Sequence, residues 1–127
     1  MPLRVQIDAE KRVILASGQG VVTDQDLLDY VEEYLGGREL GGFNELFDLS
    51  EADVRDLTYA GLSAVAAAAA ATDPAQGPVK IAILVSETRG MGVSRLYQSL
   101  RESKGGRRHT RVFWDPTECR EWLGLES

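Results

Sequence analysis

The chain has 127 residues, a net charge of −6 and a single cysteine, Cys119. This length suits a single domain, residues 1–127, which would bury roughly two thirds of the surface of the unfolded chain. Such a domain needs no disulfide or metal to fold. The acidic balance argues against nucleic acid as a partner, because phosphate neutralisation needs a basic face. No apolar run approaches the ~20 residues of a membrane span. A lone cysteine and a start unlike a signal peptide predict a cytoplasmic protein.

The amino-terminal part predicts a β-hairpin followed by an amphipathic helix. Residues 3–8 alternate between apolar and polar side chains, and the apolar run 13–16 follows a short polar break. This is the pattern of two antiparallel strands. Thr23 is a suitable N-cap for a helix whose apolar residues recur every three or four positions up to Leu35.

The stretch 43–72 predicts the centre of the fold. Residues 43–49 have the length and aromatic content of a buried strand. The alanine run 66–71 indicates a helix, starting near Thr58, that another element approaches closely. The connection 50–58 then lies at the carboxyl end of the strand, where open α/β sheets bind ligands or partners.

Two further strands and two further helices follow. The segments 79–85 and 107–114 alternate like strands. Residues 73–78 predict a turn that ends the alanine helix. A helix is expected from about Arg89 or Gly90 to Ser103, after a capping triplet at 86–88 and before a break at Gly105-Gly106. Asp115 before Pro116 marks the start of a last helix. Successive strand–helix–strand units imply parallel strands and right-handed crossovers. The sequence therefore predicts an α/β fold with a mostly parallel five-stranded sheet, about four helices and only the first strand antiparallel.

Four parts of this sequence together resemble a known family. They are the opening hairpin and the segments 47–54, 90–97 and 111–125, which read FDLSEADV, GMGVSRLY and RVFWDPTECREWLGL. Their order and spacing resemble the STAS domain of anti-sigma factor antagonists, and most closely its STAS/SEC14-like, SpoIIAA-like bacterial branch. The resemblance implies a sheet wound with helices, no catalysis, and a regulatory or ligand-sensing role. No cofactor and no metal are expected.

One departure from that family concerns its phosphorylation switch. The resemblance places a phosphorylatable serine at the start of the helix after the third strand, where this chain has Thr58-Tyr59-Ala60-Gly61. The serine switch is therefore expected to be absent. Thr58 or Ser63 could still accept phosphate, since phosphate suits a helix N-terminus. An N-cap role for Thr58 is the favoured alternative.

Two groups of residues are candidates for binding a ligand or partner. Asp48, Thr58 and Tyr59 follow the central strand. The segment 86–95 offers a helix N-terminus for a small anion or a lipid-type ligand, through Ser86, Gly90, Met91, Gly92 and Arg95. Ordinary capping is the alternative for this segment. Asp48 with Asp53 and Asp56 could be read as a cation site, but their spacing matches no calcium loop.

Charge is unevenly distributed along the chain. Residues 1–60 carry 5 basic and 13 acidic side chains, a net of −8, whereas residues 61–127 carry 9 basic and 7 acidic ones, a net of +2. The basic residues between Arg101 and Arg111 are interpreted as a solvated or partner-facing patch. Together with a sheet face at Lys80, Ala82 and Leu84 that looks incompletely covered, this asymmetry predicts a homodimer.

Three functions remain open from the sequence. The first is a non-enzymatic STAS-like module that binds a protein partner or a small apolar or anionic ligand. The second is a small hydrolase or isomerase, which lacks a Ser/His/Asp order, a nucleophile elbow or a metal motif. The third is a purely structural homo-oligomer.

Overall fold

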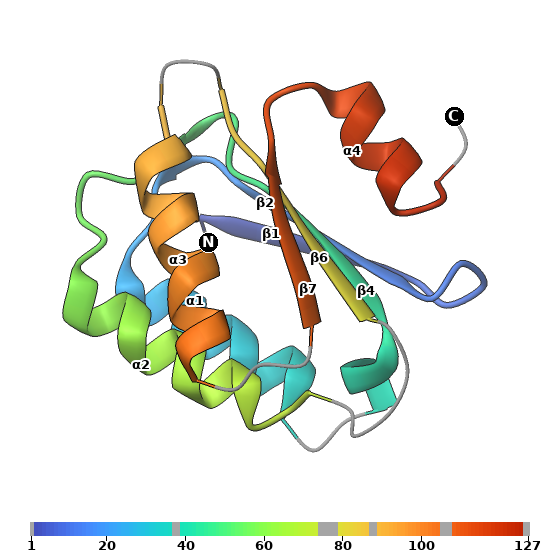
Figure 1. The fold of residues 1–127 in the computed structure, drawn as a ribbon, viewed down its shortest axis with the longest axis horizontal. Coiled ribbons are helices and arrows are strands. Elements are labelled where there is room, and N and C mark those ends of the chain that lie inside the picture. Colours follow the sequence, from blue (N-terminus) through green and yellow to red (C-terminus); the bar gives the residue numbers. More distant parts are fainter. Residues whose placement is uncertain (1, 37–38, 74–78, 87–88, 105–107, 126–127) are drawn as a thin grey trace.

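The computed structural model describes residues 2–36, 39–73, 79–86, 89–104 and 108–125. A five-stranded sheet forms the centre, in the order β1-β2-β4-β6-β7 (Figure 1). Its strands are β1 (Leu3–Asp8), β2 (Val13–Gly18), β4 (Asn44–Asp48), β6 (Val79–Leu84) and β7 (Arg108–Phe113). The β1–β2 pair is antiparallel and the other three pairs are parallel. The predicted fold class and the single antiparallel strand are confirmed.

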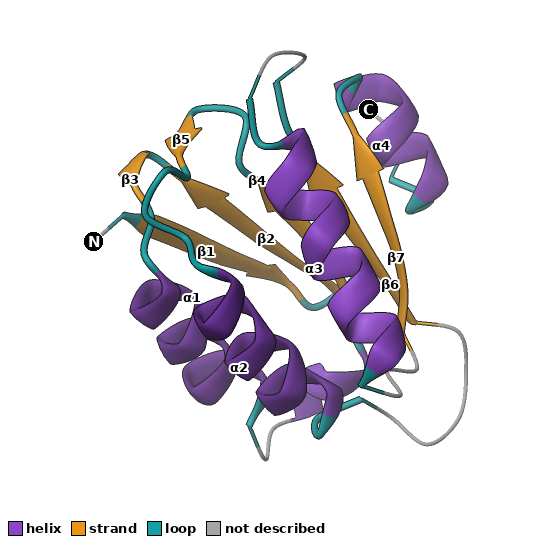
Figure 2. Cartoon of the chain, turned by 60° about the vertical axis from the view of Figure 1, so that its left-hand side comes forward, coloured by secondary structure: helices purple, strands orange, loops and turns teal. Residues whose placement is uncertain are grey.

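Three helices cover one face of the sheet and a fourth covers part of the other (Figure 2). On the first face lie α1 (Asp24–Tyr30), α2 (Tyr59–Ala70) and α3 (Met91–Ser103), and on the second lies α4 (Pro116–Trp122). The middle helix, α2, contacts both α1 and α3. Ala66 and Ala69 are buried there, and their small side chains allow this close approach.

Two short features do not follow from the sequence patterns. The expected helix up to Leu35 is α1 continued by a π-helical turn, Val31–Leu35, and a 3₁₀ turn follows at Glu39–Gly42. A second, two-stranded parallel ladder joins β3 (Gly20–Val21) to β5 (Ala52–Asp53). Strands of two residues are too short to show the alternation by which strands are recognised.

The start of α3 differs from the expected one. Its N-cap is Gly90, which has φ +88° and gives no side-chain cap, instead of a capping triplet at 86–88. The Ser86 hydroxyl accepts a hydrogen bond from the Arg89 backbone N–H at 3.0 Å and so closes a local turn before the helix. Glu87 and Thr88, the expected turn 74–78 and the Gly105–Gly106 break lie outside the described residues.

The sheet face that looked incompletely covered is covered at β6. Ala82 and Leu84 are buried with Cys119 and Leu123 of the C-terminal segment. The Lys80 ammonium group donates to the Trp122 carbonyl oxygen at 2.8 Å and lies over the indole ring. The face at Lys80, Ala82 and Leu84 was expected to be incompletely covered. At β6 this expectation was wrong, because the sequence pattern does not show that α4 folds back over that strand.

Candidate functional site

A cavity of about 60 Å³ lies between the sheet and the three helices of the first face. Its wall is mostly apolar and includes Val31, Phe47, Leu62, Val65, Ala69 and Ile83. Among the described residues, the polar side chains that border it are Tyr30, Glu45, Ser94, Tyr97 and Arg101. An apolar hollow with a few convergent polar groups is the usual form of a small-molecule site.

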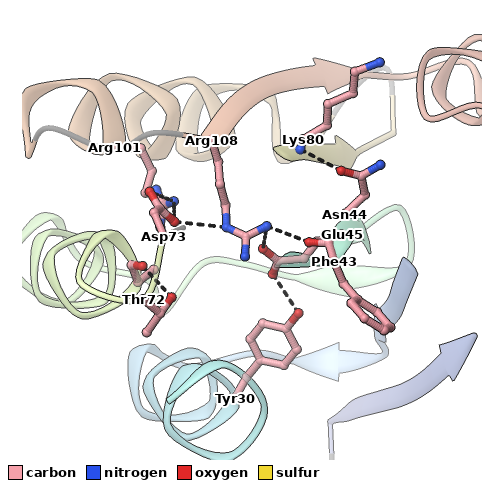
Figure 3. Close-up of polar contacts among 10 residues, drawn as sticks. Tyr30, Phe43, Asn44, Glu45, Thr72, Asp73, Lys80, Arg101 and Arg108 are labelled. Atoms are coloured by element: carbon pink, nitrogen blue, oxygen red, sulfur yellow. Dashed lines mark hydrogen bonds and ion pairs between the residues drawn. The ribbon is translucent and has the colours of Figure 1, made fainter. Parts of the chain in front are cut away.

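Three residues of the cavity wall, Tyr30, Glu45 and Arg101, belong to a buried ion cluster. We define this cluster as Tyr30, Glu45, Asp73, Arg101 and Arg108 (Figure 3). The Tyr30 hydroxyl donates to Glu45 Oε1 at 2.7 Å, and Glu45 Oε2 lies 3.2 Å from Nη1 of Arg108. Arg108 also donates to the Phe43 carbonyl oxygen at 2.8 Å. The Arg108 guanidinium thus joins β7 to β4, two strands that β6 separates in the sheet.

Asp73 connects the two arginines of the buried ion cluster. Its carboxylate accepts from Nη2 of Arg101 at 2.7 and 2.8 Å and from Nε of Arg108 at 3.0 Å. The side chains of Asp73 and Arg101 are each 1% exposed, and that of Arg108 is fully buried. Charges this deep are stable only when they are paired, so the described carboxylates and guanidinium groups depend on one another.

Local structure explains how these side chains meet. Successive residues of a strand point to opposite faces, so Glu45 and Phe47 face the helices while Leu46 packs on the α4 side. Tyr30 ends α1, Asp73 follows α2, and Arg101 lies in the last turn of α3. Each helix on this face therefore contributes one polar group at the same end of the sheet.

The interpretation of the basic stretch was wrong for two of its residues. Arg101 and Arg108 were expected in a solvated or partner-facing patch, yet both are buried, at 1% and 6% exposure. The missed signal was Glu45, a carboxylate in an apolar strand that requires a buried cationic partner. Neither its partner Arg108 nor Asp73 is close to Glu45 in sequence, so no local pattern connects them.

Burial in this region raises the pKa of two tyrosine hydroxyls. Burial, and then the neighbouring Glu45 carboxylate, holds the pKa of Tyr30 well above its usual value. Burial also raises the pKa of Tyr97 to about 12, and the adjacent Arg101 charge offsets only part of this effect. Both hydroxyls are therefore neutral hydrogen-bonding groups at physiological pH.

Tyr97 is expected to make the protein less stable at alkaline pH. Its hydroxyl has a pKa of 10.0 in an ordinary environment and about 12 in the fold. The unfolded chain therefore releases this proton first, and stability that is complete below pH ~10 is lost by pH ~12, by about 2–3 kcal/mol. Urea unfolding at pH 9 to 12 should show a smaller loss for Tyr97→Phe than for the wild type. Equal losses in the two proteins would contradict this assignment.

Comparison with known proteins bears on the fold. No protein-family model and no curated protein matches the sequence. The structure is similar to the crystal structure of an uncharacterized DUF3478-family protein from Shewanella loihica PV-4, which is described as having a SpoIIAA-like fold. The TM-score is 0.60 at 16% sequence identity, over 95% of this chain and 93% of that chain. The fold is SpoIIAA-like. At this identity the likeness carries no activity from one protein to the other.

Within this SpoIIAA-like fold, the segment considered for phosphorylation is a capped helix start. Thr58 is the N-cap of α2, and its hydroxyl accepts from the Gly61 N–H at 2.9 Å. The same hydroxyl donates to Asp24 Oδ2 at 2.7 Å. Tyr59 is 65% exposed and Ser63 is half-buried. The N-cap role of Thr58 is confirmed, whereas phosphorylation at Thr58 or Ser63 stays a prediction.

The other residues of this chain that were predicted to bind a ligand lie outside the cavity wall. Ser86, Gly90 and Met91 are half-buried, and Gly92 and Arg95 are exposed, all around the start of α3. Asp48 lies at the end of β4 and accepts from the Ser50 N–H and hydroxyl at 2.9 and 2.6 Å. Anion binding at residues 86–95 stays a prediction.

Cys119 is buried in the SpoIIAA-like fold, and Asp53, considered above for a cation site, is paired with an arginine. Burial raises the pKa of Cys119 to about 11, so this side chain is a thiol at neutral pH. Asp53 binds Nε of Arg55 at 2.7 Å. Within the described residues, no three His, Cys, Asp or Glu side chains form a group that could hold a metal ion. No helix in the described ranges is long and apolar enough to cross a bilayer.

Proposed function

We propose that the protein is a non-enzymatic binding module that holds a small apolar ligand in the cavity between the sheet and α1, α2 and α3. The observation that supports this function is the cavity itself, about 60 Å³ of space with a mostly apolar wall. Protein interiors are normally close-packed, and a void in the core lowers stability. A hollow at this place in the core is therefore well explained by a ligand that fills it.

The elements around the cavity suggest how binding would be used. All three helices on this face contribute to the wall, through residues such as Tyr30, Val65 and Val93. A bound molecule would add contacts among the three helices, and so would stabilise their arrangement by an amount that grows with the ligand concentration. This fits a regulatory module that reports the concentration of its ligand. A cytoplasmic location suits the single buried cysteine.

Binding explains the lining better than catalysis does. The polar groups of the described wall are two tyrosines with raised pKa, a serine, and the paired ions Glu45 and Arg101. Neither histidine nor cysteine occurs among the described residues of this wall, and its carboxylate, Glu45, is already bound by Tyr30 and Arg108. These groups are suited to orienting a ligand.

Filling the cavity is expected to abolish ligand retention. Ala69 lines the cavity and is 2% exposed, whereas Ala67 is exposed on the same helix. Ala69→Leu adds three carbons inside the cavity, and Ala67→Leu adds the same three carbons outside it. The proteins would be purified from their own cells, and bound molecules would be extracted and identified by mass spectrometry.

We expect one compound to be enriched with the wild type and with Ala67→Leu, and to be lost with Ala69→Leu. Far-ultraviolet circular dichroism would show that both variants are folded. A compound that Ala69→Leu retains at the wild-type level would place the ligand elsewhere, and no enriched compound in any sample would contradict the proposed function.

A further inference from the structure

The polar side of the cavity contains hydrogen-bond donors that the described protein does not use. Arg101 borders the cavity, and its Nη2 binds Asp73. Its Nε and Nη1 are buried and have no acceptor in good hydrogen-bond geometry in the described ranges; the Tyr97 hydroxyl interacts with the same guanidinium group without meeting that geometry. Buried donors in native proteins almost always have an acceptor, supplied by protein, water or ligand. The two free donors of Arg101 therefore call for an acceptor at this place.

The shape of the cavity sets the kind of molecule that can supply this acceptor. The volume of about 60 Å³ is less than half of the ~150 Å³ cavity that holds benzene. The cavity therefore encloses only a few carbon atoms, which belong to a very small molecule or to the end of a longer one. The wall extends along α3 from Val93 to Arg101, which is roughly 12 Å of helix. The half-buried Leu49, Leu57 and Val93 lie at the carboxyl ends of the strands, away from Arg101. A molecule entering between them passes an apolar wall before it reaches Arg101.

The charges at Arg101 favour an uncharged acceptor. The Asp73 carboxylate already lies 2.7 Å from Nη2 of Arg101, and the Glu45 carboxylate belongs to the same buried ion cluster. A ligand carboxylate at Arg101 would place a further negative charge beside these two in the interior, which is strongly unfavourable. A carbonyl or ether oxygen accepts the same two hydrogen bonds without adding charge.

On the basis of the proposed function, we propose that the ligand is a small apolar molecule, or the end of an apolar chain, with one uncharged oxygen acceptor. That oxygen binds at Nε and Nη1 of Arg101, and the carbon part fills the apolar cavity. This assigns Arg101 two roles, one in the ion pair with Asp73 and one in ligand recognition.

Three probes of nearly equal shape test this assignment in the full chain. Butan-2-one carries an uncharged carbonyl oxygen, 2-methylbut-1-ene replaces that oxygen by carbon, and propanoate carries a carboxylate. Each is titrated into the protein and followed by NMR, using the backbone amides of Val65, Ala69 and Val93 and the side-chain Nε–H of Arg101. The Arg101→Lys variant identifies that Nε–H signal. It keeps a positive charge beside Asp73 but lacks the planar fork of donors.

We expect butan-2-one to shift both the wall amides and the Arg101 Nε–H, and 2-methylbut-1-ene to shift the wall amides alone. In Arg101→Lys, the affinity for butan-2-one should fall about tenfold, which corresponds to ~1.4 kcal/mol, while that for 2-methylbut-1-ene should change less than twofold. Propanoate should bind more weakly than butan-2-one in the wild type.

Other outcomes overturn the assignment in distinguishable ways. Butan-2-one that shifts the wall amides but not the Arg101 Nε–H would show that its oxygen lies elsewhere. Tighter binding of propanoate would overturn the requirement for an uncharged acceptor. Binding of 2-methylbut-1-ene alone would refute the role of Arg101 and leave the proposed function standing, whereas binding of none of the probes would contradict the proposed function as well. If Arg101→Lys fails to fold, the shift of the Arg101 Nε–H signal in the wild type decides whether the oxygen of butan-2-one binds there. That signal is then assigned through the scalar couplings along the arginine side chain.

Discussion

Asp73→Asn is expected to lower the free energy of unfolding by about 3–5 kcal/mol, a large part of the stability of a domain of this size. The substitution keeps the shape of the side chain, so a cavity is not the cause. It removes the negative charge that lies 2.7 Å from Nη2 of Arg101 and 3.0 Å from Nε of Arg108. Both guanidinium groups are buried, and neither can be rehydrated without opening the core. Urea unfolding at pH 7, followed by circular dichroism, measures the effect.

The matched control is Asp53→Asn at the exposed pair with Arg55. The two charged groups are also 2.7 Å apart there, but the Arg55 side chain is 77% exposed. Water replaces the lost partner at such a site, so the urea midpoint should change little. Equal effects of Asp53→Asn and Asp73→Asn would show that the buried ion cluster does not hold the helices to the sheet as the structure indicates.

Gly61→Ala is expected to destabilise the protein by about 2–3 kcal/mol, through overpacking against α1. Helix propensity alone predicts the opposite sign, because alanine is favoured over glycine within a helix by ~1 kcal/mol. At Gly61, however, an added Cβ would overlap the Asp24 side chain. If Asp24 moved away, the Thr58 N–H and hydroxyl would lose their acceptor, at 3.1 and 2.7 Å respectively. Thermal unfolding of the variant measures the net result.

Gly92→Ala provides the control for this prediction. Gly92 is an exposed residue in the first turn of α3, and an added Cβ there would meet no other atom within 4 Å. Its substitution should therefore follow helix propensity and raise the stability slightly, by up to ~1 kcal/mol. Melting temperatures that rise for both Gly61→Ala and Gly92→Ala would mean that the contact between Asp24 and the start of α2 is dispensable.

Much of the architecture was predictable because it depends on local chemistry. Alternating side chains marked β1, β6 and β7, and a run of apolar residues marked β4. Caps such as Thr23 and Thr58 marked the starts of helices, and both hydroxyl oxygens accept a hydrogen bond from a backbone N–H of the first turn as expected. The order of strands and helices then left few arrangements, since parallel neighbours need right-handed crossovers.

The candidate site was not predictable, because it depends on contacts between residues far apart in the chain. The Tyr30–Glu45 hydrogen bond spans 15 residues, the Asp73–Arg101 pair spans 28, and the hydrogen bond from Arg108 to the Phe43 carbonyl oxygen spans 65. Arg101 and Arg108 resembled an ordinary basic surface, since their partners come from α2 and β4. The cavity is likewise a property of how helices pack on the sheet.

The sequence by itself determined the type and order of the elements, because hydrophobic periodicity and capping act over a few residues. Only the tertiary structure decided which polar residues became part of the core. Glu45 faces the helices because side chains of a strand point alternately to its two faces, which places Glu45 on the same face as Phe47. Asp73 reaches the arginines because α2 ends beside α3. Burial then converted ordinary charged side chains into a group whose members require one another. The free donors of Arg101 result from that packing, and no local sequence pattern predicts them.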